Sequence, residues 1–441
     1  MGTALAWVAV GAAAAAALPR VAAGTEWRHG WDTTAASTFA DFNANALLTD
    51  AQAKFVAEHY RVVSLEKCSG IANTTTENAI YTTAAQLKKI DPTIKVFFYL
   101  ATDQQGIQCY AANSEFQAHP EWWLKDDNGN VVMTSGHPIL DVTNAAGAAW
   151  WRGIPLSGDG NGTFGGVPVG QLIDGVLADS GGYSYYPPNI SEARLEAFED
   201  AKFAMIGELQ RTLTDLNGGL VMANGISMYG APHEDPRHPD GHNLRVLGFA
   251  NAIMNEHTAV FECVNRNNAS FNVETTSQDL DAITTAAQAA NGSKMVFVQT
   301  WPGLYSATGF TPRGSTPANV YPPVANGGEP TPQNNAEWRA ALREHFGFAH
   351  ALYLSIAEPN IYWFYGGYWY PSNTGIIACP EDPDACPAPP EWYPALNRPL
   401  GAPLGPRTLV APYVWTREFE HASVRLDLNQ PNASAVNFKN A

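Results

Sequence analysis

The segment Ile173-Asp174-Gly175-Val176-Leu177-Ala178-Asp179-Ser180-Gly181-Gly182 combines an apolar run, a carboxylate and a turn of small residues. The apolar run predicts a buried strand that ends at Asp179. In a parallel α/β barrel the active site lies at the C-terminal ends of the strands, so an acid placed there faces the reacting side. The same layout recurs at Ala252-Ile253-Met254-Asn255-Glu256. Paired strand-end carboxylates, here Asp179 and Glu256, are the minimum equipment for hydrolysing a glycosidic bond.

Apolar runs alternate with helical patterns along the chain, and no internal repeat is present. The candidate strands are Thr38–Asn43, Arg61–Glu66, Ile94–Leu100, Ile173–Asp179, Leu220–Asn224, Asn251–Glu256, Lys294–Gln299 and Ala351–Ile356. The stretches between them predict helices at Asp50–His59, Thr76–Ile90, Ser191–Leu216, Ser277–Ala290 and Ala336–Phe348, with Asp50 and Ser277 as N-caps and Asp91-Pro92 as a helix end. Strands that alternate with helices predict a parallel sheet, and eight such units predict a closed TIM (β/α)8 barrel.

The two ends of the chain differ from this pattern. Ala4 to Ala17 is apolar but too short to span a bilayer, and Val21-Ala22-Ala23 supplies the small residues of a cleavage site. We therefore predict a signal peptide over residues 1–23, a TIM-barrel domain with long loops over residues 24–395 and a secreted protein. Short alternating runs predict a small C-terminal β extension over residues 396–441; they are Tyr413–Phe419, Ser423–Leu428 and Ala435–Phe438.

Five cysteines favour an oxidising compartment. Cys68 and Cys109 each follow a predicted strand, and a disulfide between them requires those strands to be neighbours. Cys379 and Cys386 are spaced for a local disulfide, and Cys263 is left over, although spacing alone does not fix connectivity. N-glycosylation sequons occur at Asn73, Asn161, Asn189, Asn268, Asn291 and Asn432.

The charge balance limits the class of ligand. The formal net charge is −17 and no basic stripe occurs, which argues against nucleic acid as a partner. A polyanionic substrate is disfavoured for the same reason, and a neutral or cationic substrate fits better. No later apolar run approaches the length of a membrane span, so we expect no membrane partner.

Asp179 is the predicted nucleophile or base and Glu256 the predicted general acid, although either carboxylate could instead cap a helix or orient a sugar hydroxyl. Glu66 also ends a predicted strand and is the next catalytic candidate. The predicted substrate-binding residues are strand-end polar groups and aromatic side chains on which sugar rings stack; they are Glu66, Asp103, Asn224, Gln299, Trp301, Tyr183, Trp363 and Tyr365. A loop rich in His, Glu and Asp at residues 233–242 lacks the spacing of a metal site, so we expect no metal and no cofactor.

Several short stretches, in this order, resemble a known grouping. They are Ser64-Leu65-Glu66-Lys67-Cys68, Phe97-Phe98-Tyr99-Leu100-Ala101-Thr102, His119-Pro120-Glu121-Trp122-Trp123-Leu124-Lys125, Leu140-Asp141-Val142-Thr143-Asn144, Asp174-Gly175-Val176-Leu177-Ala178-Asp179, Gln299-Thr300-Trp301-Pro302-Gly303, Pro399-Leu400-Gly401-Ala402-Pro403-Leu404-Gly405 and Thr416-Arg417-Glu418-Phe419-Glu420. The chain resembles the hypothetical glycosyl hydrolase family 15-like proteins. This resemblance implies a barrel with a β tail and a carbohydrate-active role, but no catalytic residues and no substrate.

We therefore expect a secreted, monomeric glycoside hydrolase that acts on an oligo- or polysaccharide through two carboxylates. The alternative is a non-catalytic carbohydrate-binding barrel of a cell wall or extracellular matrix, because a fold does not fix a function. Carboxylate geometry separates the two, since an enzyme holds its acids about 5–10 Å apart.

Overall fold

The computed structural model of the chain describes residues 25–42, 46–103, 107–134, 136–182, 189–226, 243–256, 258, 273–300, 332–365 and 392–439. Several predictions fall on other residues and lie outside this described part. They concern the signal peptide at 1–23, the pair Cys379 and Cys386, Cys263, Asn268, Tyr183 and Trp301.

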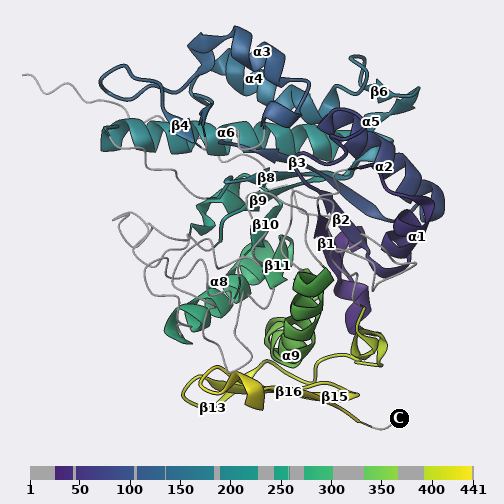
Figure 1. Ribbon diagram of the computed structural model, residues 1–441. Coiled ribbons are helices and arrows are strands. Elements are labelled where there is room, and N and C mark those ends of the chain that lie inside the picture. Colours follow the sequence, from purple (N-terminus) through teal and green to yellow (C-terminus); the bar gives the residue numbers. More distant parts are fainter. Residues whose placement is uncertain are drawn as a thin grey trace, which may run out of the picture.

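A parallel sheet forms the centre of the molecule (Figure 1). Its eight strands pair in chain order. They are β1 (Phe39–Phe42), β2 (Val62–Leu65), β3 (Lys95–Ala101), β8 (Gly175–Asp179), β9 (Leu220–Asn224), β10 (Ala252–Asn255), β11 (Met295–Thr300) and β12 (Ile361–Tyr365). A parallel bridge between Thr38 and Trp363 brings the last strand back to the first. The predicted TIM-barrel fold is thereby confirmed.

The eighth strand is not where the sequence predicted it. Ala351–Ile356 forms the end of helix α9 (Pro332–Ile356), and the strand is β12, a few residues later. A short apolar run does not distinguish a buried helix segment from a buried strand. The prediction failed for this reason, and the residues of the true strand were not predicted as a strand.

Helices cover the outside of the sheet. They are α1 (Asp50–His59), α2 (Thr76–Ile90), α3 (Asn113–Ala118), α4 (Ala145–Gly153), α5 (Val169–Leu172), α6 (Glu192–Asn217), α8 (Val273–Gly292) and α9. Helix α2 ends at Asp91 as predicted. Both predicted N-caps are wrong, because Thr49 caps α1 in a capping box with Gln52 and Ser277 lies inside α8. Short hairpins lie among the loops; their strands are β4 (Met133–Thr134), β5 (His137–Pro138), β6 (Thr163–Phe164) and β7 (Val167–Pro168).

Aromatic side chains fill the barrel interior. The ring of Phe297 lies 5.1 Å from that of Phe39 and 5.6 Å from that of Phe97, measured between centroids. Phe364 packs against Phe39 at 5.7 Å. A Cβ atom on Gly175 would come within 2.4 Å of the Phe97 ring, so this strand needs glycine where the phenylalanine crosses it. The barrel is therefore packed below its mouth.

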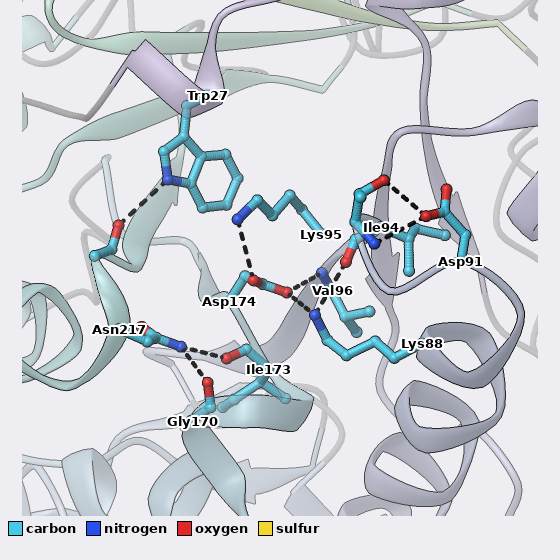
Figure 2. A network of polar contacts seen from close by, with 12 residues as sticks. Trp27, Lys88, Asp91, Ile94, Lys95, Val96, Gly170, Ile173, Asp174 and Asn217 are labelled. Atoms are coloured by element: carbon cyan, nitrogen blue, oxygen red, sulfur yellow. Dashed lines mark hydrogen bonds and ion pairs between the residues drawn. The ribbon is translucent and has the colours of Figure 1, made fainter.

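Asp174, just before β8, holds the opposite end of the barrel together (Figure 2). Its carboxylate accepts hydrogen bonds from Lys88 Nζ at 2.7 Å, Lys95 Nζ at 3.4 Å and the Val96 backbone N–H at 3.0 Å. The Trp27 indole lies beneath the Lys95 ammonium, which is 5.1 Å from its centroid. Asp174 therefore joins α2 and β3 to the start of β8, at the face where TIM barrels keep residues for stability.

The C-terminal strands form a separate antiparallel sheet beside α9 (Figure 1). They are β13 (Thr408–Ala411), β14 (Val414–Glu418), β15 (Ala422–Asp427) and β16 (Ala435–Phe438). Arg417 is buried and its guanidinium donates to the carbonyls of Ala357 and Leu354 at 2.7 and 3.3 Å. It thus satisfies carbonyls at the end of α9 that the helix leaves unpaired.

Two further predictions concern glycosylation and the membrane. Within the described residues, five sequon asparagines are exposed: Asn73, Asn161, Asn189, Asn291 and Asn432. Exposure makes them accessible, and glycosylation itself stays a prediction. Among the helices of the described part, none is long and apolar enough to cross a membrane.

We expect Asp174→Asn to lower the free energy of unfolding by about 2–3 kcal/mol, because hydrogen bonds to a charged group contribute about 1.5–3 kcal/mol each. Denaturant unfolding would measure the change. The control is Asp281→Asn, which removes a carboxylate that is 71% exposed and paired with Arg407, and this change should cost under about 1 kcal/mol. Equal losses in both variants would contradict a special role for Asp174.

Candidate active site

Polar side chains from the ends of five adjacent strands form one hydrogen-bonded chain at the barrel mouth. Glu66 and Lys67 follow β2, Tyr99 lies on β3, Asp179 ends β8, Asn224 ends β9 and Glu256 follows β10. Lys67 Nζ contacts Glu66 Oε2 at 3.2 Å and donates to the Tyr99 hydroxyl oxygen at 2.9 Å. The Tyr99 hydroxyl in turn donates to Asp179 Oδ2.

Asn224 links the two predicted catalytic carboxylates. Its Nδ2 atom donates to Asp179 Oδ1 at 2.8 Å and to Glu256 Oε2 at 2.5 Å. The sum of these distances is an upper limit on the separation of the two oxygen atoms. Asp179 and Glu256 therefore face each other closely enough to act on one bond.

The sequence around Asp179 explains how its carboxylate is fixed. The backbone N–H of Ser180 donates to Asp179 Oδ1 at 2.8 Å, with Ser180 at a positive φ of 55°. A Cβ atom on Gly181 would approach the Ala178 carbonyl oxygen to 2.6 Å, so the turn requires glycine there. Lys202 of α6 donates to the Ser180 carbonyl at 3.0 Å. The strand end and the buried lysine together hold the turn and with it the carboxylate.

Burial changes the acidity of this cluster. Desolvation raises the pKa of Glu256 to about 7, helped by the charge of Asp179 and opposed by Lys67. Burial raises the pKa of Glu66 to about 7 as well, although the adjacent Lys67 lowers it. The pKa of Asp41, on β1, lies well above its usual range because of burial and the charges of Glu66 and Glu256. The mouth therefore concentrates carboxyl groups that retain protons near neutral pH.

Asp179 differs from Glu256 in its surroundings. The Asp179 carboxylate accepts hydrogen bonds from a phenol, a backbone N–H and a side-chain amide. These hydrogen bonds fix the orientation of the Asp179 carboxylate. Burial is the largest influence on the pKa of Glu256 and raises it. Asp179 is thus an oriented acceptor, and Glu256 is arranged to hold a proton.

The structure brings several other predicted residues to the same mouth. Asp103 lies beside the Asp179 turn, where it accepts from Ser180 Oγ at 3.3 Å, and it lines a cavity together with Lys202 and Phe198. Gln299 lies two residues after the inward-facing Phe297 on β11, so it faces the barrel interior, and it is fully buried. Whether these residues bind substrate stays a prediction.

Two predicted substrate-binding residues are placed elsewhere. Trp363 lies between the inward-facing Tyr362 and Phe364, so it points out of the barrel, and its ring stacks on Tyr353 of α9 at 5.0 Å. Tyr365 faces the same way and packs against Phe346 at 5.7 Å. Both rings pack against α9 on the outer face of the strand, and whether Trp363 and Tyr365 contact substrate stays a prediction. The alternation of side chains along a strand sends them to the helical layer.

The sequence analysis did not single out Tyr99, Asp41 or Lys67 as site residues. Tyr99 shares its strand face with Phe97, and Asp41 shares its face with Phe39. A polar group at every second position of an otherwise apolar strand is the signal that could have found both. Within the described ranges, no cluster of His, Cys, Asp and Glu is arranged to hold a metal ion.

The predicted disulfide between Cys68 and Cys109 is present, with Cα atoms 5.0 Å apart. It joins the loop after β2 to the loop after β3, as the adjacency of these strands allows. Cys68 follows directly on Glu66-Lys67 and has a positive φ of 60°. The disulfide therefore anchors the loop that carries these two charged side chains.

No protein-family model matches the chain, and no curated protein sequence matches it. Solved glycoside hydrolases do resemble it in structure. An α-amylase from Geobacillus thermoleovorans, solved with acarbose, is 10% identical, with a TM-score of 0.41 and coverage of 88% of this chain and 85% of that one. An α-amylase from H. orenii is 11% identical, with a TM-score of 0.44 and coverage of 90% of each chain.

The trehalose-6-phosphate hydrolase of Bacillus licheniformis is a further example. It is 10% identical, with a TM-score of 0.43 and coverage of 76% of this chain and 65% of that one. Likenesses at this level carry no argument about the reaction. The barrel assignment rests on the strand order described above.

Removing the disulfide in the double variant Cys68→Ala, Cys109→Ala should lower the free energy of unfolding by about 3–4 kcal/mol, because the bond closes a loop of 41 residues. Thermal and denaturant unfolding would measure the loss. Non-reducing peptide mapping of the wild type provides the independent check. Recovery of both peptides as free thiols, or an unchanged stability in the double variant, would contradict the assignment.

Proposed function

We propose that this protein is a glycoside hydrolase that acts with retention of configuration, with Asp179 as the nucleophile and Glu256 as the general acid and base. The observation that carries the proposal is the Asn224 amide, which donates to both carboxylates. A single amide group can bridge them only if they lie on either side of one small space.

The distances favour retention over inversion. Inverting enzymes hold their carboxyl groups about 6.5–9.5 Å apart to admit a water molecule, whereas retaining enzymes hold them about 5–5.5 Å apart. The upper limit that the Asn224 contacts place on the separation applies to one oxygen of each carboxylate, and it agrees with the shorter, retaining spacing. This supports direct attack of Asp179 on the anomeric carbon.

The two roles follow from the surroundings of each acid. In the first step an Asp179 oxygen attacks the anomeric carbon while Glu256 gives its proton to the departing glycosidic oxygen. In the second step Glu256 takes a proton from water, the resulting hydroxide attacks the anomeric carbon, and the bond to Asp179 breaks. The hydrogen bonds to Asp179 orient the nucleophile, and the raised pKa of Glu256 supplies the proton near neutral pH.

The finer expectations belong to the same proposal. They are an oligo- or polysaccharide substrate, secretion after removal of residues 1–23, a monomeric state and the resemblance to the hypothetical glycosyl hydrolase family 15-like proteins. The net charge of −17 supports a neutral or cationic rather than an anionic substrate. The alternative of a carbohydrate-binding barrel without catalysis explains the buried carboxyl groups less well, because binding alone requires no carboxyl group with a raised pKa beside a second carboxylate.

We expect Asp179→Asn and Glu256→Gln each to nearly abolish turnover of a glycoside identified by a glycan-panel screen. General acid–base catalysis supplies about 10²–10⁴-fold, and loss of a nucleophile costs more. The measurement is kcat/KM on that glycoside, with folding checked by thermal unfolding. The control is Asp215→Asn, an equal charge change on the exposed surface of α6. Near-normal activity of Asp179→Asn would remove this residue from the mechanism and make Glu66 the next candidate.

The pH dependence tests which acid donates the proton. Because the pKa of Glu256 is raised to about 7, the protonated acid is present below that pH and is lost above it, so kcat/KM should fall as pH rises through about 7. Glu256→Gln should still turn over a glycosyl fluoride, which needs no proton on its leaving group, and should do so without this alkaline fall. On the ordinary glycoside, Glu66→Gln should retain the fall. Loss of the fall in Glu66→Gln alone would reverse the two assignments.

A further inference from the structure

Among the described residues, buried polar atoms without a hydrogen-bond partner occur at the floor of the barrel mouth. They include Asp41 Oδ1, on a side chain that is 1% exposed, and both Nε2 and Oε1 of the fully buried Gln299. The hydroxyl of Ser64, which pairs with Asp41 across β1 and β2, is unpaired as well. Buried polar groups are almost always hydrogen-bonded in proteins, so unpaired atoms at the barrel mouth need an explanation. A bound ligand supplies one.

The Asp41 and Gln299 side chains face the space that the candidate catalytic acids surround. Asp41 lies two residues after Phe39 and Gln299 two residues after Phe297, and these phenylalanines pack against each other inside the barrel. The charges of Glu66 and Glu256 both raise the pKa of Asp41. Asn255 of β10 pairs with Val298 of β11, so the next residue along each strand places Gln299 beside Glu256. The unpaired atoms therefore lie above the aromatic core, next to the catalytic pair.

Carboxyl groups dominate this space. Four of them converge there from Asp41, Glu66, Asp179 and Glu256, and Lys67 is the cation that influences them within the described residues. The Lys67 ammonium is already bound to Glu66 and Tyr99. A cationic ligand group would favour the ionised form of these carboxyl groups and bind to it, whereas a neutral hydroxyl would not.

We propose that the sugar ring bound at the barrel mouth carries a protonated amine, and that Asp41 receives it. The inference rests on the proposed function and names the substrate class as a glycoside of an amino sugar with a free amino group. An ammonium supplies three donors, of which Asp41 Oδ1 and Gln299 Oε1 can each accept one. Gln299 Nε2 is then free to donate to a neighbouring hydroxyl oxygen of the same ring.

The first test varies the ligand and leaves the protein unchanged. The probes are 4-nitrophenyl glycosides of 2-amino-2-deoxyglucose and 2-amino-2-deoxygalactose, each with its N-acetyl and its 2-hydroxyl counterpart. The wild-type protein should show a kcat/KM at least 10-fold higher for one free-amine glycoside than for both of its neutral counterparts. Acetylation removes the charge and adds bulk, while the 2-hydroxyl compound removes the charge alone. Equal or better turnover of the neutral glycosides would overturn the inference.

The second test varies Asp41. Asp41→Asn should reduce kcat/KM for the preferred free-amine glycoside by roughly 10- to 100-fold, as expected for loss of a hydrogen bond to a charged group. Turnover of the 2-hydroxyl compound should change much less, so the preference for the amine should collapse. Asp215→Asn controls for the change in overall charge. An unchanged preference in a folded Asp41→Asn variant would overturn the role of Asp41, and if the variant fails to fold, the wild-type comparison still decides the substrate class.

The outcomes also separate this inference from the proposed function. Turnover confined to neutral glycosides, lost in Asp179→Asn, would overturn the amine inference and leave the hydrolase standing. If no glycoside is turned over, calorimetry with free glucosamine, galactosamine and their N-acetyl forms decides the inference by itself. Tighter binding of an amine would support it for a binding barrel, and equal binding would overturn it.

Discussion

The register of the parallel sheet is the constraint on which the rest of the structure depends. Parallel pairing places all eight strand ends at one mouth, and the alternation of side chains sends every second residue inward. Because Ala101 pairs with Asp179 and Ala178 with Ala223, Tyr99, Asp179 and Asn224 come within hydrogen-bonding distance of one another. A slip of one residue in β8 would turn Asp179 to the helical layer.

The two carboxylates of the first quoted segment show how position along one strand divides stability from chemistry. Asp174 precedes β8 and is bound by two lysines and a backbone N–H, so its charge is balanced. Asp179 ends the same strand, where further carboxyl groups surround it and the Tyr99 hydroxyl links it to Lys67. Concentrating uncompensated acids is costly for folding but useful for catalysis, because it separates their acidities. The disulfide, Lys202 and the glycines after Ser180 hold this arrangement in place.

The site also shows why a TIM barrel suits proton transfer between facing groups. Five adjacent strands each end near one or two of the polar side chains, which are thereby held by a rigid backbone. No long loop of the described part is needed to bring the acids together. Asn224 occupies the strand between those of the two acids, where its amide can reach both. Aromatic packing beneath the mouth excludes water from below, which strengthens every electrostatic interaction above it.

The sequence by itself determined the barrel, most strand positions and the acids at two strand ends, because periodicity and turn residues are local properties of a chain. It suggested the Cys68–Cys109 disulfide, which the adjacency of β2 and β3 then decided. It did not determine β12, since the run Ala351–Ile356 has the composition of a strand but continues a helix. Only the tertiary structure decided that Trp363 faces α9, that Tyr99 binds Asp179 and that Asp41 and Gln299 share the floor of the mouth. These relations depend on which strand faces pack inward and on contacts between residues far apart in sequence, and no local pattern encodes those distances.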